Sequence, residues 1–262
     1  MELSKRLQAV ADLVSERMSV ADVGTDHGYI PIYLIETKKC AKALAMDVNQ
    51  GPLLRAKEHI AEHGLSEQIQ TRLSDGVRAL KEGECDCVVI AGMGGALTIK
   101  ILEEGKAIFR VLKEFVLQPQ SELFKVRKYL CENGYQIIAE DMVLEDGKFY
   151  PMMKVINVDT EVLTVDKQCK PEQCESECRE TMQRQAMARD MEQEVALDYG
   201  KILLENRHPI LKEFLDKEVR TKEQILHTLN MQSGLHIEHR KKEIQMELEG
   251  AQYALQKYYG CD

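Results

Sequence analysis

The strongest constraint on the fold is an alternation of short β-type runs with helical segments between residues 19 and 133. The runs SVADV, AKALAMDV, QIQTRL, CDCVVIAG and EFVLQP are separated by stretches with helical spacing or helix-capping residues. Such alternation predicts a parallel sheet with helices on both faces. Residues 135–158 then have the pattern of an antiparallel hairpin whose turn is Glu145-Asp146-Gly147. We therefore expect a Rossmann-like α/β sheet closed by a hairpin.

Helical periodicity replaces the β pattern after about residue 160. One apolar stripe follows Pro209, and a second lies beyond a break near Gly234 with heptad-like spacings. Two such stripes predict an antiparallel helical hairpin, and an intermolecular coiled coil is the alternative. We expect two domains, residues 1–160 and residues 161–262.

The charge of the chain does not indicate a nucleic-acid-binding domain. The formal net charge is −9, whereas such domains usually carry a basic face. An RNA partner would need small local patches. Three candidates are Lys38-Lys39-Lys42, Lys125-Arg127-Lys128 and Arg240-Lys241-Lys242, although each is more often a solvated face.

The cysteines indicate a reducing compartment. Eight of them are spread along a chain that is large enough to fold without disulfides, so we expect free thiols and a cytoplasmic protein. Cys169, Cys174 and Cys178 form the one cluster, but no fourth ligand is evident for a zinc site, and we predict no metal. No apolar stretch reaches the roughly 20 residues of a membrane span.

Residues suited to holding a nucleoside follow the predicted strands. Gly24 and Gly28 allow a tight turn and a close approach of the backbone to a ligand. Asp47 ends the second strand, where a carboxylate can accept ribose hydroxyls. The third and fourth strands end in Ser74-Asp75-Gly76 and in Gly92-Met93-Gly94-Gly95. Because ligands of doubly wound folds bind at the carboxyl ends of strands, we expect these residues to gather at one edge.

Asp26 decides between classes of cofactor. A dinucleotide site binds pyrophosphate at the helix N-terminus that follows the first strand, and a carboxylate in that turn would repel phosphate. S-adenosylmethionine has a ribose, an adenine and a positively charged sulfonium, but it has no phosphate. A nearby carboxylate favours such a cation. The turn therefore predicts S-adenosylmethionine and argues against a nicotinamide enzyme.

Seven segments resemble the bacterial tRNA (adenine-22-N1)-methyltransferase family, and the resemblance spans residues 1 to about 230. The segments are LSKRLQAVADLV, DVGTDHGYIPIYL, DVNQGPL, SDG, VVIAGMGG, LQP and HPILKEFL. The most specific feature is the pair D-x-G-T-D-H-G-Y-x-P and A-G-M-G-G. The resemblance implies a Rossmann-like class I methyltransferase domain followed by an α-helical antiparallel coiled-coil domain.

The strand ends and the resemblance together assign candidate site residues. Those expected to bind the cofactor are Asp22, Gly24, Asp26, Gly28, Asp47, Val48, Ser74, Asp75, Gly76, Gly92 and Met93. Asp26 and His27 are the expected catalytic residues, between the cofactor and the target base. Those expected on the substrate side are Arg6, Gly94, Gly95, Gln118 and Pro119.

The implied reaction is methylation of N1 of adenine 22 in tRNA, with S-adenosylmethionine as cofactor. Neutral adenine carries a lone pair on N1, so catalysis would depend mainly on alignment and electrostatics. Asp26 would stabilise the positive charge of the product base or accept a proton from its amino group. Since N1 lies on the Watson–Crick edge, the target base must be unpaired or flipped out.

Two other functions fit the same fold. A small-molecule methyltransferase would suit the acidic charge, and its helical hairpin would serve as a lid or dimer element. A non-catalytic adaptor would bind S-adenosylmethionine and recruit partners through its coiled coil. The intact Asp26 and the open glycine turn argue against the adaptor. We expect tRNA as the partner, no membrane association and a monomer.

Overall fold

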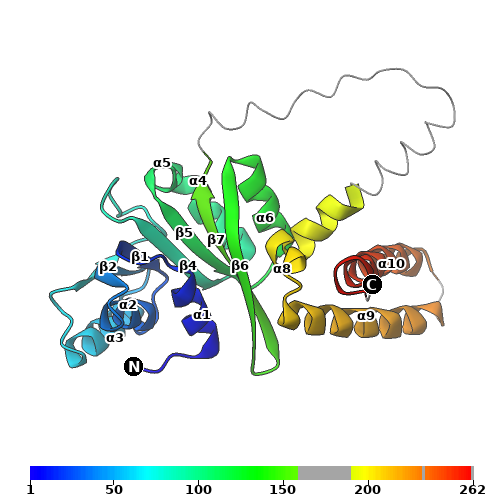
Figure 1. Cartoon of the computed structure of the whole chain (residues 1–262), viewed down its shortest axis with the longest axis horizontal. Coiled ribbons are helices and arrows are strands. Elements are labelled where there is room, and N and C mark those ends of the chain that lie inside the picture. Colours follow the sequence, from blue (N-terminus) through cyan, green and yellow to red (C-terminus); the bar gives the residue numbers. More distant parts are fainter. Residues whose placement is uncertain (159–189, 232–233, 261–262) are drawn as a thin grey trace, which may run out of the picture. The chain divides into compact units, whose positions relative to one another are not determined.

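A mixed sheet with strand order β3-β2-β1-β4-β5-β7-β6 forms the first part of the chain (Figure 1). The computed structural model describes residues 1–158, 190–231 and 234–260. The strands are β1 (Met18–Val23), β2 (Cys40–Asp47), β3 (Ile69–Leu73), β4 (Cys87–Met93), β5 (Glu114–Pro119), β6 (Tyr135–Glu145) and β7 (Lys148–Asn157). Strands β1 to β5 pair in parallel, and β7 joins β5 and β6 in antiparallel pairing. The predicted parallel sheet with a closing hairpin is confirmed.

Six helices flank this sheet: α1 (Lys5–Leu13), α2 (Tyr29–Glu36), α3 (Gln50–Glu62), α4 (Gly95–Glu104), α5 (Lys106–Val111) and α6 (Leu123–Glu132). Buried residues of α1, α2 and α3 share one apolar cluster, whereas those of α4, α5 and α6 share another. The two clusters therefore lie on opposite faces of the sheet, as the alternation of strands and helices predicted.

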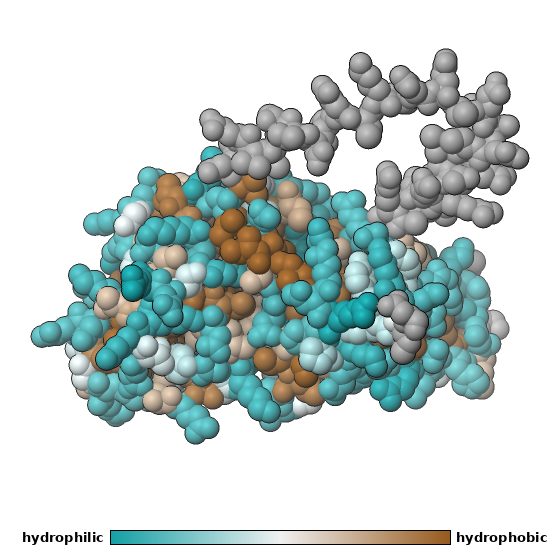
Figure 2. All heavy atoms as spheres, viewed as in Figure 1, coloured by the Kyte–Doolittle hydropathy of each residue, from teal (hydrophilic) through white to brown (hydrophobic). Residues whose placement is uncertain are grey.

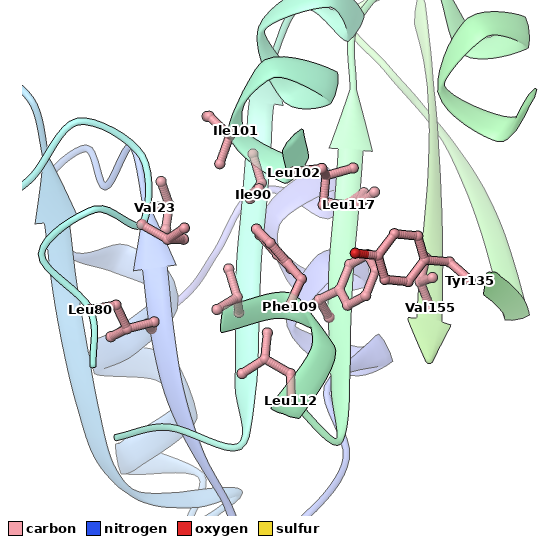
Figure 3. Close-up of a cluster of buried hydrophobic side chains, with 14 of the residues drawn as sticks. Val23, Leu80, Ile90, Ile101, Leu102, Phe109, Leu112, Leu117, Tyr135 and Val155 are labelled. Carbon is pink, nitrogen blue, oxygen red and sulfur yellow. The ribbon is translucent and has the colours of Figure 1, made fainter. Parts of the chain in front are cut away.

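Strand β4 supplies side chains to both faces because successive residues of a strand point in opposite directions. Cys87 and Val89 belong to the cluster under α1–α3, and Val88 and Ile90 belong to the cluster under α4–α6. Figure 3 shows the second cluster, in which Phe109 lies among side chains from the central strands. Burial on both faces explains why this strand is almost continuously apolar.

The hairpin ends in a tight two-residue turn. Glu145 pairs with Lys148, which leaves Asp146 and Gly147 as the loop. Both residues have positive φ angles, 49° and 73°. This is the pattern of a type I′ turn, whose twist matches that of the flanking strands. The predicted turn is confirmed, with Glu145 as the last paired residue of β6.

The second part of the chain is helical. It contains a helix over residues 190–199 and then α8 (Lys201–Glu205), α9 (Pro209–Asn230), α10 (Leu235–Ala254) and a π-helical turn, η2 (Leu255–Tyr259). Helices α9 and α10 pack against each other. Lys222 forms an ion pair with Glu247, and the Tyr259 hydroxyl donates to the His208 carbonyl. The end of η2 thus lies beside the start of α9, and the later part of α9 pairs with α10. The two helices therefore run in opposite directions, and the predicted antiparallel helical hairpin is confirmed.

The apolar stripes pack within the chain at the base of this hairpin. Leu211 and Leu215 of α9 are buried, as are Ile244, Leu248 and Ala251 of α10. An intermolecular coiled coil is therefore not needed to cover them.

The chain divides into two compact units, Met1–Val165 and Asp166–Asp262. The predicted boundary between residues 160 and 161, and the cluster of Cys169, Cys174 and Cys178, lie outside the described residues. Within the described part, no group of side chains is arranged to hold a metal ion, and no helix has the length and apolarity to cross a membrane. Figure 2 shows that most of the face in view is hydrophilic.

We predict that Arg127→Met destabilises the first unit strongly. Arg127 of α6 and Glu140 of β6 form a 3.0 Å ion pair with side chains only 3% and 1% exposed. Removing the cation breaks this buried ion pair, which costs roughly 3–5 kcal/mol. Urea unfolding measures the loss, and Lys128→Met, on the exposed side of α6, should change the free energy of unfolding by less than about 0.5 kcal/mol. Equal effects of the two substitutions would contradict this account.

Candidate active site

A cavity of about 310 Å³ lies at the carboxyl ends of β1 and β4. It is lined by Arg6, Leu7, Asp22, Gly24, Asp26, Tyr29, Ile30, Ala91, Gly92 and Gln120. Strand β1 has β2 on one side and β4 on the other, so the chain crosses over in opposite directions at this point. Such a switch point is where open α/β sheets bind their ligands. The predicted residues Arg6, Asp22, Gly24, Asp26 and Gly92 thus come together.

The loop after β1 requires glycine at position 24. Gly24 has a φ of 78°, and a Cβ atom there would lie 2.2 Å from Cε of Met93. The amides of Gly24 and Thr25 both donate to the Met46 carbonyl, at 2.8 and 2.9 Å. The loop is thus tied to the end of β2, and Met93 from β4 lies across its glycine.

Asp22 is a buried carboxyl group in the wall of the cavity. The residue is only 5% exposed. The pKa of Asp22 is raised from 3.8 to about 6, mainly because the carboxyl group is buried; the polar side chain of Thr25 opposes this shift, and the negative charge of Asp47 contributes to it. An ionised Asp22 is therefore costly without a partner, and a cation in the cavity would offset that cost.

Asp26 is more exposed and has two neighbours. Arg55 of α3 donates to its Oδ1 at 3.1 Å, and Nε2 of His27 lies 3.4 Å from the same oxygen. The Asp26 side chain is 68% exposed and that of Arg55 is 47% exposed. The two residues orient the carboxylate while leaving much of it open to solvent. Sequence reasoning missed Arg55, because only the packing of α3 beside the loop brings it to this site.

His27, an expected catalytic residue, contacts two aromatic rings and the Asp26 carboxylate. It does not line the cavity, and its ring stacks on Tyr29 with a centroid distance of 5.2 Å and an interplanar angle of 8°. His59 of α3 packs at 5.0 Å from His27 and 5.7 Å from Tyr29. His27 therefore supports the neighbouring ring. Tyr29 was not among the predicted site residues, although it stands in the quoted motif.

The ends of β2 and β3 carry the expected nucleoside-binding residues outside that cavity. Oδ1 of Asp47 accepts a 2.7 Å bond from the Asn49 amide, and Val48 beside it is 58% exposed. Ser74 is buried, and its hydroxyl donates to the Gly76 carbonyl and accepts from the Ala79 amide.

Ser74 thus shapes the turn in which Asp75 stands. Asp75 pairs with Arg78 at 3.1 Å, and Gly76 has a φ of 56°. Gly28 is the N-cap residue of α2, with a φ of 69°, and a Cβ atom there would contact Ala56 and Ile60 of α3.

Gln118 joins three elements at the cavity wall. This side chain at the end of β5 is fully buried. Its Oε1 accepts from Nη1 of Arg6 at 2.9 Å and from the Gly92 amide at 3.1 Å. Gln118 therefore holds Arg6 of α1 beside the end of β4, and it does not itself line the cavity. Pro119 is buried next to it and does not line the cavity.

Gly95, expected on the substrate side, does not line the cavity. It is buried, and a Cβ atom would lie 2.4 Å from the Ser121 carbonyl oxygen and 2.9 Å from Cβ of Glu122. Any larger residue would push α4 away from the loop after β5. Gly94 is the N-cap residue of α4 and also does not line the cavity.

Ser121 stands just before α6, where a serine commonly caps the following helix, but it caps a different one. Its Oγ accepts from the Gly95 amide at 3.2 Å, and Glu122 accepts from the Ala96 amide at 2.9 Å. Both side chains therefore cap α4, a helix distant in sequence. Helix α6 begins after Glu122 without a side-chain cap.

Most of the predicted basic patches are engaged within the protein. Lys39 donates to the Ala11 and Asp12 carbonyls at 2.8 and 2.7 Å. Arg127 is buried beside Glu140, and Arg240 pairs with Glu243 at 2.8 Å. Arg6 and Arg55 are instead the basic side chains found at the cavity and beside Asp26.

Comparisons with known proteins agree with this geometry. A profile of the family described as "Methyltransferase domain" matches residues 3–153. The tRNA (adenine(22)-N(1))-methyltransferase of Bacillus subtilis is 39% identical over 153 residues, which are 58% of this chain and 64% of that protein. The alignment thus spans less than two thirds of that relative.

Two solved structures are similar over nearly the whole chain. The B. subtilis m1A22 tRNA methyltransferase TrmK has a TM-score of 0.77 and 27% identity, covering 97% of this chain and 99% of that one. M. capricolum TrmK, solved with S-adenosyl-homocysteine, has a TM-score of 0.74 and 25% identity, covering 98% and 100%.

We predict that Asp22→Asn stabilises the protein at neutral pH. Because the pKa of Asp22 is raised from 3.8 to about 6, the folded state keeps a proton between these two pH values that the unfolded state has released. Stability from this group is therefore greatest below pH 4 and falls as the pH rises to 6. The substitution should raise the unfolding free energy at pH 7.5 by on the order of 1–3 kcal/mol, and hardly at pH 4. Urea unfolding at both pH values tests this, and an equal change at both would contradict it.

Proposed function

The chain belongs to the tRNA (adenine-22-N1)-methyltransferase family, and from this premise we propose that it methylates N1 of adenine 22 in tRNA with S-adenosylmethionine. The observation that carries the proposal is the cavity at the β1–β4 switch point, which is lined by Asp22 and Asp26. Its two carboxylates and its glycine loop suit a cationic ligand that carries no phosphate.

The residues at the strand ends fit S-adenosylmethionine. Asp47, half-buried at the end of β2, would accept the ribose hydroxyls. Asp75 in the turn after β3 would accept from the adenine amino group, and the exposed Val48 would contact the adenine ring. Asp22 would receive positive charge in the cavity, where the Gly24 loop leaves room. When bound, the cofactor supplies an electrophilic methyl group on a positively charged sulfur.

In the proposed reaction, the protein aligns the target base and stabilises its new charge. The N1 lone pair of neutral adenine would form the new bond to the methyl carbon as the bond from that carbon to the sulfonium sulfur breaks and its electron pair stays on sulfur, so no general base is required. The methylated base is positively charged, and Asp26 would face that charge from the cavity wall. Arg55 and His27 orient Asp26 before the base arrives, which is the preorganisation that makes electrostatic catalysis effective. Arg6, which also lines the cavity, would contact the RNA.

We also propose that the protein acts as a cytoplasmic monomer. The free cysteines Cys40, Cys85, Cys87 and Cys131 support a reducing compartment. The packing of α9 on α10 supports the monomer, because the apolar stripes cover each other within one chain.

The proposed function predicts transfer of a labelled methyl group from S-adenosylmethionine to unmodified tRNA, with 1-methyladenosine as the product nucleoside. A transcript with guanine in place of adenine 22 is the matched control and should accept no label. Binding of the cofactor without transfer to tRNA would overturn the proposal and favour a small-molecule substrate or an adaptor.

Asp26→Asn should slow methyl transfer far more than it weakens cofactor binding. Removing a group that faces developing charge costs roughly 10²- to 10³-fold in turnover, whereas the dissociation constant of S-adenosylmethionine should change less than about threefold. Single-turnover kinetics and calorimetry measure the two quantities. Glu62→Gln, at the exposed end of α3, is the control and should leave both unchanged. Equal losses in transfer and binding would reject a catalytic role for Asp26.

A further inference from the structure

Tyr29 is the one aromatic side chain among the described residues that line the cavity. It is the first residue of α2 and is partly exposed. Asp26, the proposed catalytic carboxylate, lines the same cavity from the loop just before it. The apolar side chains of Leu7 and Ile30 lie along the same wall. An aromatic ring between apolar neighbours and a carboxylate is a surface suited to a flat base with polar edges.

The ring of Tyr29 is held by its neighbours. His27 stacks nearly parallel to it, and His59 of α3 contacts both rings at a tilt. Nδ1 of His59 lies 3.2 Å from the His27 carbonyl, which ties α3 to the loop. A ring fixed in this way loses little freedom when a ligand stacks on it.

The Asp26 carboxylate contacts the same group of rings, formed by His27, Tyr29 and His59. His27 Nε2 lies 3.4 Å from Asp26 Oδ1, and Arg55 of α3 donates to that oxygen. His27 thus contacts Tyr29 on one side and Asp26 on the other. The ring and the carboxylate are positioned by one set of contacts between the loop after β1 and α3.

We propose that Tyr29 is the stacking platform for the target adenine of the RNA. This inference rests on the proposed function. A base removed from a helix loses its stacking, at a cost of a few kcal/mol, and an aromatic ring of the protein can replace that interaction. The stacked base would then present its edge in the cavity that Asp26 lines. His27 and His59 support Tyr29 and do not contact the base.

The proposal predicts different effects of two substitutions at one position. Tyr29→Leu keeps an apolar side chain but removes the ring, and kcat/KM for tRNA should fall roughly 10- to 100-fold. Tyr29→Phe keeps the ring and should stay within about threefold of the wild type, since stacking does not need the hydroxyl. The dissociation constant of S-adenosylmethionine should change less than threefold in both variants, which also reports that the variants are folded.

Tyr33→Leu is the matched control. Tyr33 lies one turn further along α2, is also partly exposed and does not line the cavity. This variant should keep the wild-type kcat/KM for tRNA. A loss as large as that of Tyr29→Leu would overturn the proposal, because it would mean that α2 tolerates no such change.

A direct readout uses a tRNA transcript with 2-aminopurine at position 22. Stacking on Tyr29 should keep the fluorescence of this base low when wild-type protein and S-adenosyl-homocysteine are added, and in the Tyr29→Leu complex it should rise severalfold. Unchanged kcat/KM in Tyr29→Leu, or equal losses in Tyr29→Leu and Tyr29→Phe, would overturn the role of Tyr29 alone. Failure of the wild type to form 1-methyladenosine would instead reject the proposed function.

Discussion

The parallel pairing of β1 with β4 is the constraint on which the candidate site depends. It places the loops after these two strands side by side, so that Met93 covers Gly24 and the cavity opens between Asp22 and Gly92. Apolar side chains on both faces of these strands stabilise the pairing. The site is therefore built on the most buried part of the sheet, where loop positions are held by the strands beneath them.

Two carboxyl groups, those of Asp22 and Asp26, line the cavity, and the buried one lowers the stability of the folded protein when it ionises. The buried Asp22 carboxyl opposes ionisation, and Asp47 at the end of the next strand strengthens that opposition. A ligand that brings positive charge would remove the penalty, so the cost of the site to stability is a source of affinity for a cation. The Asp26 carboxylate differs because Arg55 already accompanies it. The two carboxylates can thus have different roles in one cavity, because Asp22 is buried and Asp26 is exposed and paired with Arg55.

Local sequence rules worked where the interacting groups are neighbours in the chain. The type I′ turn at Asp146 and Gly147 follows from adjacent residues, and the alternation in β4 follows from burial on two faces. Local rules do not describe the contacts of Ser121 and Arg127. Ser121 caps α4 and Arg127 is buried against Glu140, and in each case the partner is supplied by another element, which no local pattern reveals.

The sequence by itself determined the order and type of the elements, the glycine turns and the carboxylates at the strand ends, because these follow from periodicity and from residue chemistry along a single stretch. Only the tertiary structure decided which of those residues meet. It brought Arg6 to the cavity through Gln118, Arg55 to Asp26 and His59 to Tyr29, and it buried Gly95. The reason is physical: contacts between elements depend on the packing of α1, α3 and α4 against the sheet, and this packing is a property of the whole core.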